Sequence, residues 1–193
     1  MKFWIETSRL ILRDFNEDDW PHYSGHFKEP ESQLGILKYQ SGDDYLKNTF
    51  ESCLRLTKYQ YRRGYHLMIV EKESQIPIGN CSLVPAITHA RNTQVGWHFG
   101  YEYRGKGYAT EAANRLLELG FKKQLVSTIH ADTFLENIAS IRVMEKLGMK
   151  RKHSGIFMRW IRGYRYGERR AIVKYQITKQ MWDTNRMPSI HYQ

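Results

Sequence analysis

The residues best suited to binding chemistry form a short glycine-containing segment between a predicted strand and a strongly amphipathic helix. They are Arg104, Gly105, Lys106, Gly107, Tyr108 and Ala109. Glycine lets the backbone approach a ligand closely, and the free N–H groups and dipole of a helix N-terminus attract phosphate oxygens. The spacing matches neither G-x-G-x-x-G nor G-x-x-x-x-G-K-[ST], which argues against the two common nucleotide-binding loops. The segment therefore predicts a pyrophosphate site, with a plain tight turn as the alternative.

The elements that must position this segment follow from hydrophobic periodicity. Apolar and small residues fall at positions 109, 112, 113, 116 and 117, the spacing of a helix that packs one face on a core. Strands are predicted at 8–15, 65–71, 77–85, 94–101, 126–133, 157–161 and 171–177, and helices after 16–19, over 43–63, from 109 onward and from 137 to 147. This order is typical of an α+β fold with helices layered on one sheet.

Length and composition indicate one globular domain. The chain has 193 residues, of which 41% are hydrophobic and 26% charged, enough for a single core. No apolar run approaches the roughly 18 residues of a membrane span, and Glu6 comes before any stretch that could form a signal-peptide core. Two cysteines are too few for a disulfide framework or a four-cysteine zinc site. We expect a cytoplasmic protein without a metal, with its domain over 1–181 and a loose, aperiodic tail over 182–193.

Positive charge is concentrated near the C-terminus. The net charge is +10, and residues 150–174 hold nine Lys or Arg against the single acid Glu168. The rest of the chain is nearly neutral. This block predicts an anionic partner at 159–170, with a solvated arginine-rich hairpin as the alternative.

Several motifs together resemble the GNAT superfamily of acyl-CoA N-acyltransferases. The loop pattern [QR]-x-x-G-x-[GA] of that family is matched by Arg104, Gly107 and Ala109. The opening Thr-Ser-Arg-Leu-Ile-Leu-Arg at 7–13 is similar to T-x-R-L-I-L-R, and residues 137–149 are similar to the N-x-x-S-x-x-x-x-E-K-x-G-F signature of the ribosomal-protein N-acetyltransferase (RimJ/RimL-like) branch. The resemblance spans nearly the whole chain.

The resemblance implies a fold and a co-substrate. It implies a single domain with a mixed, mostly antiparallel sheet of about seven strands, splayed between the fourth and fifth, and about four helices. Acetyl-CoA would lie in the gap, with its pyrophosphate on the amides of 104–109. Backbone groups of Phe99, Gly100 and Tyr101 would pair with pantetheine and polarise the thioester. Asn137 would bind the pantetheine side while also capping the next helix.

The resemblance also directs attention to proton-transfer groups. Many RimJ/RimL-like sequences have an acid where this chain has Gln94, which cannot accept a proton. Asp132 is the first candidate base, with an ion pair to arginine as its alternative role, and His130 shares its strand face. Relatives with a Tyr acid have it where Met144 stands, so Ser140 is the candidate acid, with a local hydrogen-bonding role as its alternative. Tyr164 and Tyr166 in the last hairpin could also reach the acceptor.

The function expected from these residues is acetyl transfer from acetyl-CoA to a primary amine in a ternary complex, without a covalent enzyme intermediate. The resemblance favours a protein N-terminal α-amino group as acceptor. A small-molecule amine is an alternative, although the positive net charge argues against polycations. An RNA- or ribosome-binding module using the basic hairpin is another. The sequence leaves a monomer and a homodimer equally open.

Overall fold

The structure is a computed structural model that describes residues 3–29, 42–59, 62, 64–85, 92–123, 126–152 and 171–185. Its strands are β1 (Trp4–Glu6), β2 (Leu10–Asp14), β3 (Tyr65–Glu71), β4 (Pro77–Pro85), β5 (Asn92–Phe99), β6 (Thr128–Phe134), β7 (Lys150–Lys152) and β8 (Ile172–Thr178). Its α-helices are α1 (Trp20–Lys28), α2 (Asp43–Leu56), α3 (Tyr108–Lys123), α4 (Ile138–Lys146) and α5 (Lys179–Thr184), with 3-10 turns at Glu17–Asp19 and Tyr101–Tyr103.

All the described strands belong to one sheet, in the order β1-β2-β3-β4-β5-β6-β8-β7. Every neighbouring pair is antiparallel except β5 and β6, which are parallel. The predicted α+β fold with a mixed, mostly antiparallel sheet is confirmed, with eight strands in the described residues instead of about seven.

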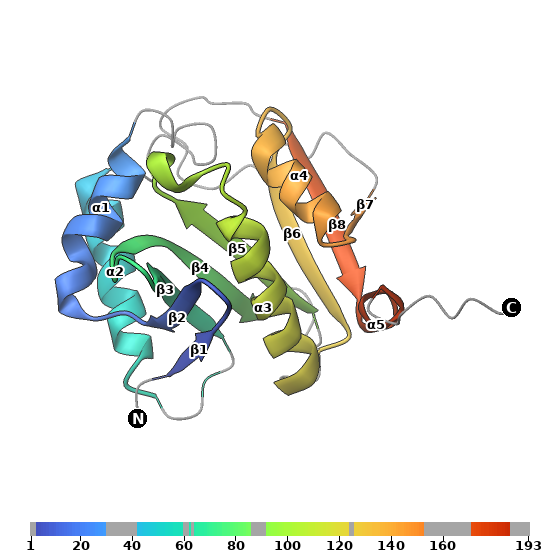
Figure 1. Ribbon diagram of the computed structural model, residues 1–193, viewed down its shortest axis with the longest axis horizontal. Helices are drawn as coiled ribbons and strands as arrows, with labels where there is room; N and C mark the ends of the chain where they lie inside the picture. Colours follow the sequence, from blue (N-terminus) through green and yellow to red (C-terminus); the bar gives the residue numbers. More distant parts are fainter. Residues whose placement is uncertain are drawn as a thin grey trace, which may run out of the picture.

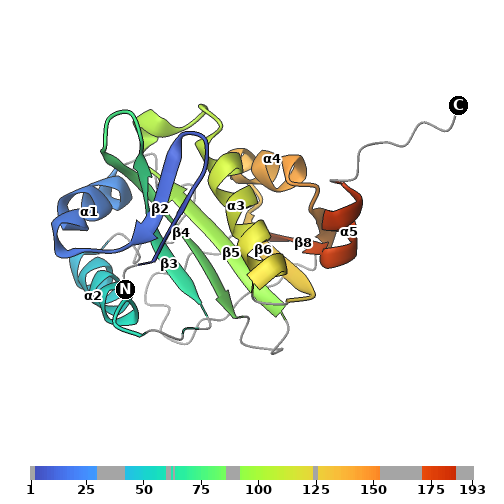
Figure 2. The same cartoon turned by 60° about the horizontal axis from the view of Figure 1, so that its bottom comes forward.

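Helices cover both faces of the sheet (Figures 1 and 2). Successive side chains of β3 point to opposite faces of the sheet. Leu67 and Ile69 belong to the core under α3, whereas Met68 belongs to the cluster under α1 and α2. The predicted amphipathic helix is confirmed as α3, in which the side chains at 112, 113, 116 and 117 are fully buried. The residues after the glycine segment are thus held rigidly against the sheet.

One element at the far edge of the sheet, β7, was not predicted from the sequence. Strand β7 pairs with β8 through three exposed cationic residues, a pattern without the apolar alternation that would have predicted a strand. The strand predicted at 157–161 lies outside the described residues.

The C-terminal end of the described chain is more ordered than the sequence suggested. Helix α5 begins after Thr178, whose hydroxyl accepts a hydrogen bond from the Met181 amide at 3.2 Å. The Trp182 ring is 5% exposed and packs 5.4 Å from Phe121 between ring centres. The predicted domain boundary at 181 therefore cuts through an ordered helix, because one buried aromatic ring anchors a segment too short to show periodicity.

Candidate active site

The main opening in the sheet lies between β5 and β6. Their parallel pairing covers three residue pairs, from Asn92 with Thr128 to Gln94 with His130. Beyond that point β5 stays paired with β4 as far as Phe99, and β6 stays paired with β8 as far as Phe134. The two strands therefore diverge toward their C-terminal ends, as Figure 1 shows. The predicted splay is confirmed, and it leaves two facing strand edges whose backbone groups can bind an extended ligand.

The glycine segment lies beside this opening and leads directly into α3. Gly105 has a φ of +76° and Gly107 a φ of +83°, conformations that favour glycine over residues with a Cβ. Among the described residues, a Cβ on Gly105 would meet nothing within 4 Å, and one on Gly107 would meet only an Arg9 guanidinium nitrogen at 3.5 Å. The described part of the chain therefore leaves the space in front of the loop open. The N-terminal amides of a 16-residue helix face it, an arrangement that fits a pyrophosphate.

A brace that the sequence analysis missed holds this loop to the start of the chain. The Glu111 carboxylate accepts hydrogen bonds from the Thr7 hydroxyl at 2.5 Å, the Ser8 hydroxyl at 3.0 Å and the Arg9 amide at 2.9 Å. It also accepts from Arg9 Nε at 2.8 Å. Burial raises the pKa of Glu111, but these donors outweigh that effect and the net pKa is lowered. The carboxylate therefore stays ionised at neutral pH.

The Arg9 guanidinium extends the brace over the loop itself. It donates to the Lys106 carbonyl at 3.0 Å and lies 4.4 Å from the centre of the Tyr108 ring. The Tyr108 hydroxyl in turn donates to Glu71 on β3. The available sequence signal was the carboxylate in the first turn of a helix, a favoured position beside the positive end of the helix dipole. That signal does not say which distant residues the carboxylate binds.

The backbone after β5 is more fully engaged than predicted. The Gly100 amide donates to the Ile78 carbonyl at 3.2 Å, and the Tyr101 amide donates to the Glu29 carboxylate at 2.7 Å. The Arg104 side chain donates from Nε and Nη2 to the Phe99 carbonyl at 3.1 and 3.0 Å. A ligand would have to replace Ile78 or Glu29 as the acceptor for the Gly100 and Tyr101 N–H groups. The thioester-polarising role of Phe99, Gly100 and Tyr101 stays a prediction. Arg104 closes the turn that presents the loop.

Asp132, the predicted base, lies where the two strands separate. The Gln94 side-chain amide donates to Asp132 Oδ1 at 2.5 Å, and the Asp132 carboxylate is exposed to solvent. His130 lies directly opposite Gln94 in the register. Asp132 is thus held by the residue that occupies the position of the expected acid, which places a proton acceptor at the vertex of the opening.

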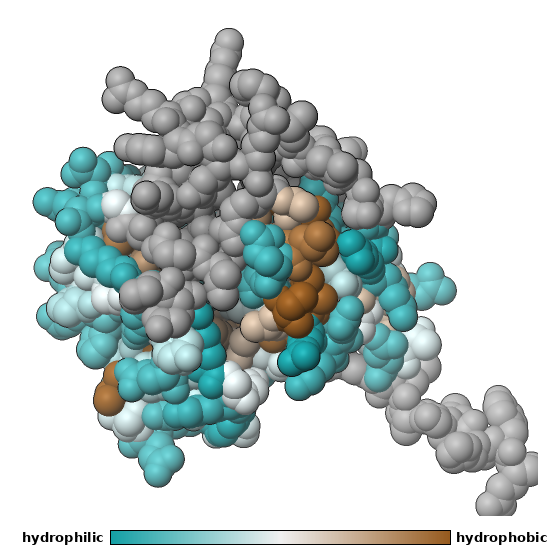
Figure 3. Space-filling model, turned by 90° about the horizontal axis from the view of Figure 1, so that it is seen from above, coloured by the Kyte–Doolittle hydropathy of each residue, from teal (hydrophilic) through white to brown (hydrophobic). Residues whose placement is uncertain are grey.

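The start of α4 holds the remaining predicted pair. The Asn137 side chain accepts a hydrogen bond from the Ser140 amide at 3.2 Å, so its helix-capping role is observed. Just before and after it, Leu135 is 44% exposed and Ile138 is 50% exposed. Figure 3, which looks down on this end of the molecule, shows apolar surface over the start of α4. The helix therefore presents a capped N-terminus and an apolar surface toward the opening.

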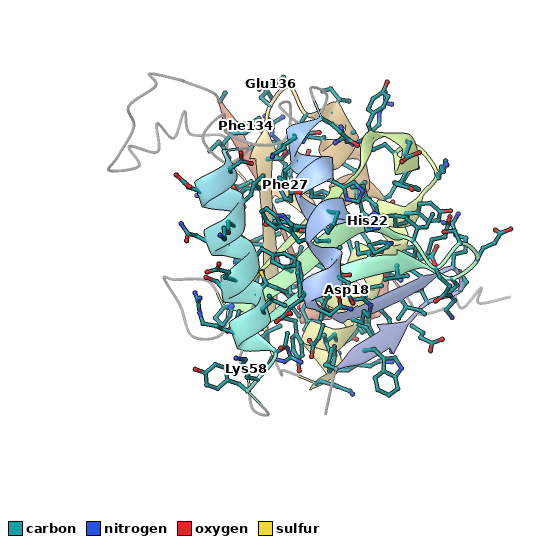
Figure 4. The ribbon with its side chains drawn as sticks, turned by 90° about the vertical axis from the view of Figure 1, so that its left-hand side faces the viewer. Asp18, His22, Phe27, Lys58, Phe134 and Glu136 are labelled. Carbon is teal, nitrogen blue, oxygen red and sulfur yellow. The ribbon has the colours of Figure 1, made fainter. Side chains whose placement is uncertain are left out.

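The face of the sheet under α1 carries neutral aromatic groups beside the opening. The Phe27 ring stacks on His98 of β5, with 4.0 Å between ring centres, and His98 Nε2 lies 3.1 Å from the His26 carbonyl. Burial lowers the pKa of both His98 and His26 to about 4, so both rings are neutral at pH 7. In Figure 4 Phe27 projects from α1 over the sheet, and Phe134 marks the end of β6.

The remaining features are the basic segment, a metal site and a membrane-spanning helix. The basic segment 159–170, with Tyr164 and Tyr166, lies outside the described residues. Within the described ranges no group of three His, Cys, Asp or Glu side chains could hold a metal ion. No helix in those ranges is long and apolar enough to cross a membrane.

A single α+β domain whose sheet opens beside a glycine loop and a helix N-terminus has the architecture of an acyl-CoA-dependent acyltransferase. The chain belongs to the GNAT acetyltransferase family, because the protein-family model described as "Acetyltransferase (GNAT) domain" matches its residues 9–150. The chain is accordingly an acetyl-CoA-dependent N-acetyltransferase, as its relatives also support.

Three similar proteins illustrate the family. The uncharacterized N-acetyltransferase YnaD of Bacillus subtilis is 30% identical over 157 residues, which cover 81% of this chain and 87% of the relative. A spermidine N-acetyltransferase from Vibrio cholerae, solved in complex with CoA and spermine, superposes with a TM-score of 0.73 at 16% identity, covering 91% of this chain and 99% of the other. A ribosomal-protein-S5-alanine acetyltransferase from Vibrio fischeri superposes with a TM-score of 0.70 at 19% identity, with 93% and 98% covered.

Proposed function

We propose that this enzyme acetylates the α-amino group of a protein N-terminus, as expected for the RimJ/RimL-like branch. The observation that carries the proposal is the opening between β5 and β6, with Asp132 at its vertex and the glycine loop beside its mouth. The residues of α4 that match the branch signature, and the fold shared with the ribosomal-protein-S5-alanine acetyltransferase, support the acceptor class. The net charge of +10 disfavours polyamines.

The residues around the opening divide into those that would hold acetyl-CoA and those that would handle the proton. The amides of Gly105, Gly107 and Ala109 would bind the pyrophosphate, and Asn137 and the free edge of β5 would face the pantetheine arm. Acetyl-CoA supplies an activated acyl group that passes from sulfur to the amine nitrogen, while the amine loses one proton and the thiolate gains one. The loop and the helix dipole would orient the anionic end and add no proton chemistry.

Proton transfer would fall to the groups at the vertex and at the start of α4. Asp132 accepts a hydrogen bond from Gln94, which orients its carboxylate, and its second oxygen can accept a proton from an ammonium group directly or through a water. Ser140 lies one turn into α4 and carries the hydroxyl that we assign to the leaving thiolate.

The test is product analysis with labelled acetyl-CoA. The purified protein is incubated with N-terminal peptides, with the same peptides blocked at the α-amino group, and with spermidine, and mass spectrometry locates the label. We expect label on free α-amino groups and none on the blocked peptides. Label on lysine side chains or on spermidine alone would overturn the proposed acceptor class while leaving the acetyltransferase assignment intact.

A further inference from the structure

A cavity separate from the β5–β6 opening lies under α1 and α2, against β3 and β4. Its volume is about 160 Å³. Its aromatic walls include Phe15, Tyr23 and Phe27, and Thr49 of α2 also lines it. An engineered cavity of about 150 Å³ is known to bind benzene. The space therefore matches one ring-sized group of about six heavy atoms.

The lining of this cavity carries no formal charge at neutral pH. No Asp, Glu, Lys or Arg occurs among its lining residues in the described chain. Burial lowers the pKa of His66 and raises the pKa of the Cys53 thiol to about 12, so both stay neutral at pH 7. A charged group placed in the cavity would lose its hydration without gaining a counter-charge. The occupant must therefore be uncharged.

One lining group lacks a hydrogen-bond partner. The side-chain nitrogen of Asn80 is buried, and no acceptor lies within hydrogen-bond distance of it in the described part of the chain. A buried donor without a partner destabilises the unoccupied cavity, because it has lost its hydration without gaining a hydrogen bond. An oxygen atom on the occupant, either a carbonyl or a hydroxyl, would satisfy this amide.

The sheet register connects the cavity to the reaction centre. Asn80 of β4 lies directly opposite His98 of β5, and His98 precedes Phe99 at the edge of the opening. Directly opposed residues on neighbouring strands have Cβ atoms about 4.5–5.5 Å apart. Phe27 lines the cavity and also stacks on His98 at 4.0 Å. A group bound in the cavity would therefore lie against the same strand, β5, whose other edge lines the opening.

We propose that this cavity is the specificity pocket for the acceptor: it binds an uncharged, ring-sized, oxygen-bearing group attached near the amine, with Asn80 donating to that oxygen. The proposal rests on the proposed function, because it assumes that the acceptor amine reacts at the opening between β5 and β6. The proposed substrate class is a primary amine that carries, close to its nitrogen, an uncharged aromatic group with an oxygen atom. A polyamine chain would place a cation in the cavity without a counter-charge.

The test uses three amides that share a free α-amino group: tyrosinamide, phenylalaninamide and glycinamide. Thr49→Phe fills the cavity from α2, and Asn48→Phe places the same side chain on the exposed neighbouring position as a matched control. We expect Thr49→Phe to raise KM for tyrosinamide about tenfold or more and to leave glycinamide within about twofold. Asn48→Phe should change neither. Equal effects of the two variants, or an unchanged tyrosinamide KM in Thr49→Phe, would overturn the pocket.

A second variant keeps the proposal falsifiable if Thr49→Phe does not fold. Asn80→Leu keeps the side-chain size but removes the donor, so the wild-type preference for tyrosinamide over phenylalaninamide should fall about tenfold. A preference that survives in Asn80→Leu would overturn the assigned hydrogen bond.

Calorimetric binding of tyrosinamide separates this proposal from the proposed function. Binding that Thr49→Phe abolishes, without turnover of any α-amine, would reject the acceptor chemistry and retain the pocket. Turnover of all three amides with equal kcat/KM would retain the chemistry and reject the pocket, as expected of a cavity that holds only water.

Discussion

Truncating Glu111 to alanine should destabilise the protein and loosen the glycine loop together. The substitution removes the acceptor of the four hydrogen bonds that join the first turn of α3 to Thr7, Ser8 and Arg9. A single hydrogen bond to a charged group contributes about 1.5–3 kcal/mol. The Glu111 side chain is 16% exposed, but the Arg9 side chain is 46% exposed, so water screens the ion pair. We therefore expect the whole group to contribute about 2–3 kcal/mol rather than the sum of its parts.

The matched control is Glu118→Ala in the same helix. Glu118 pairs with Arg115 and Lys122 along the surface of α3, contacts worth about 0.3–0.5 kcal/mol each. For a domain of this size 1 kcal/mol shifts Tm by about 2–4 °C, so Glu111→Ala should lower Tm by about 5–10 °C and Glu118→Ala by no more than about 4 °C.

Scanning calorimetry of the free protein and titration with coenzyme A measure the two consequences separately. Glu111→Ala should weaken coenzyme A binding severalfold, because its loop is no longer held in place, whereas Glu118→Ala should bind like the wild type. Equal Tm losses in the two variants would refute the reasoning, since the brace would then be worth no more than a surface ion pair.

Three further outcomes are expected. Gly107→Val should lower the affinity for coenzyme A more than tenfold in a folded protein, as titration calorimetry would show. Gly105→Val should destabilise the protein to a similar extent, because Gly105 also has a positive φ, but it should lower the affinity less, because its Cβ would meet none of the described residues. Asp132→Asn should lower kcat/KM about 100-fold with coenzyme binding retained, and a loss under threefold would remove Asp132 from the mechanism. Folding stability should fall as pH drops from about 6.5 toward 4, because unfolded histidine takes up a proton near pH 6.5 while buried His26 and His98 resist it down to about 4. His98→Asn should flatten that slope in pH-dependent unfolding.

Elements with local signals could be predicted from the sequence. The spacing of apolar residues located α3, and the three strands before it were predicted because each alternates or carries a short apolar run between turns. The cap of α4 by Asn137 followed from residue type and position. The splay came from the family motifs rather than from periodicity, which cannot show where two strands separate.

The features that the sequence did not reveal depend on contacts between distant segments. The Thr7 hydroxyl and the Glu111 carboxylate are 104 residues apart in the chain, and nothing in either segment names the other. The engagement of the Tyr101 amide by Glu29 depends likewise on how α1 crosses the end of β5. The cavity at Asn80 exists only once two helices cover the sheet. Such sites are defined by packing, which leaves no periodic trace.

The three residue pairs between β5 and β6 have a further consequence for how the molecule opens and closes. The ladder between β5 and β6 has three residue pairs, whereas the ladders on either side of it, β4–β5 and β6–β8, have seven each. Local opening of a protein follows its weakest cooperative boundary. The free energy of local opening should therefore be lower at the β5–β6 ladder than in the ladders on either side. Slower amide hydrogen exchange in these residues on adding the ligand would report that the ligand is bound. A ligand that bridges both edges would add RT ln(1 + [L]/Kd) to the global stability, about 2.7 kcal/mol at a hundredfold excess over Kd. The opening proposed to receive acetyl-CoA would thus also be the boundary at which the two parts of the sheet separate first in the unliganded enzyme.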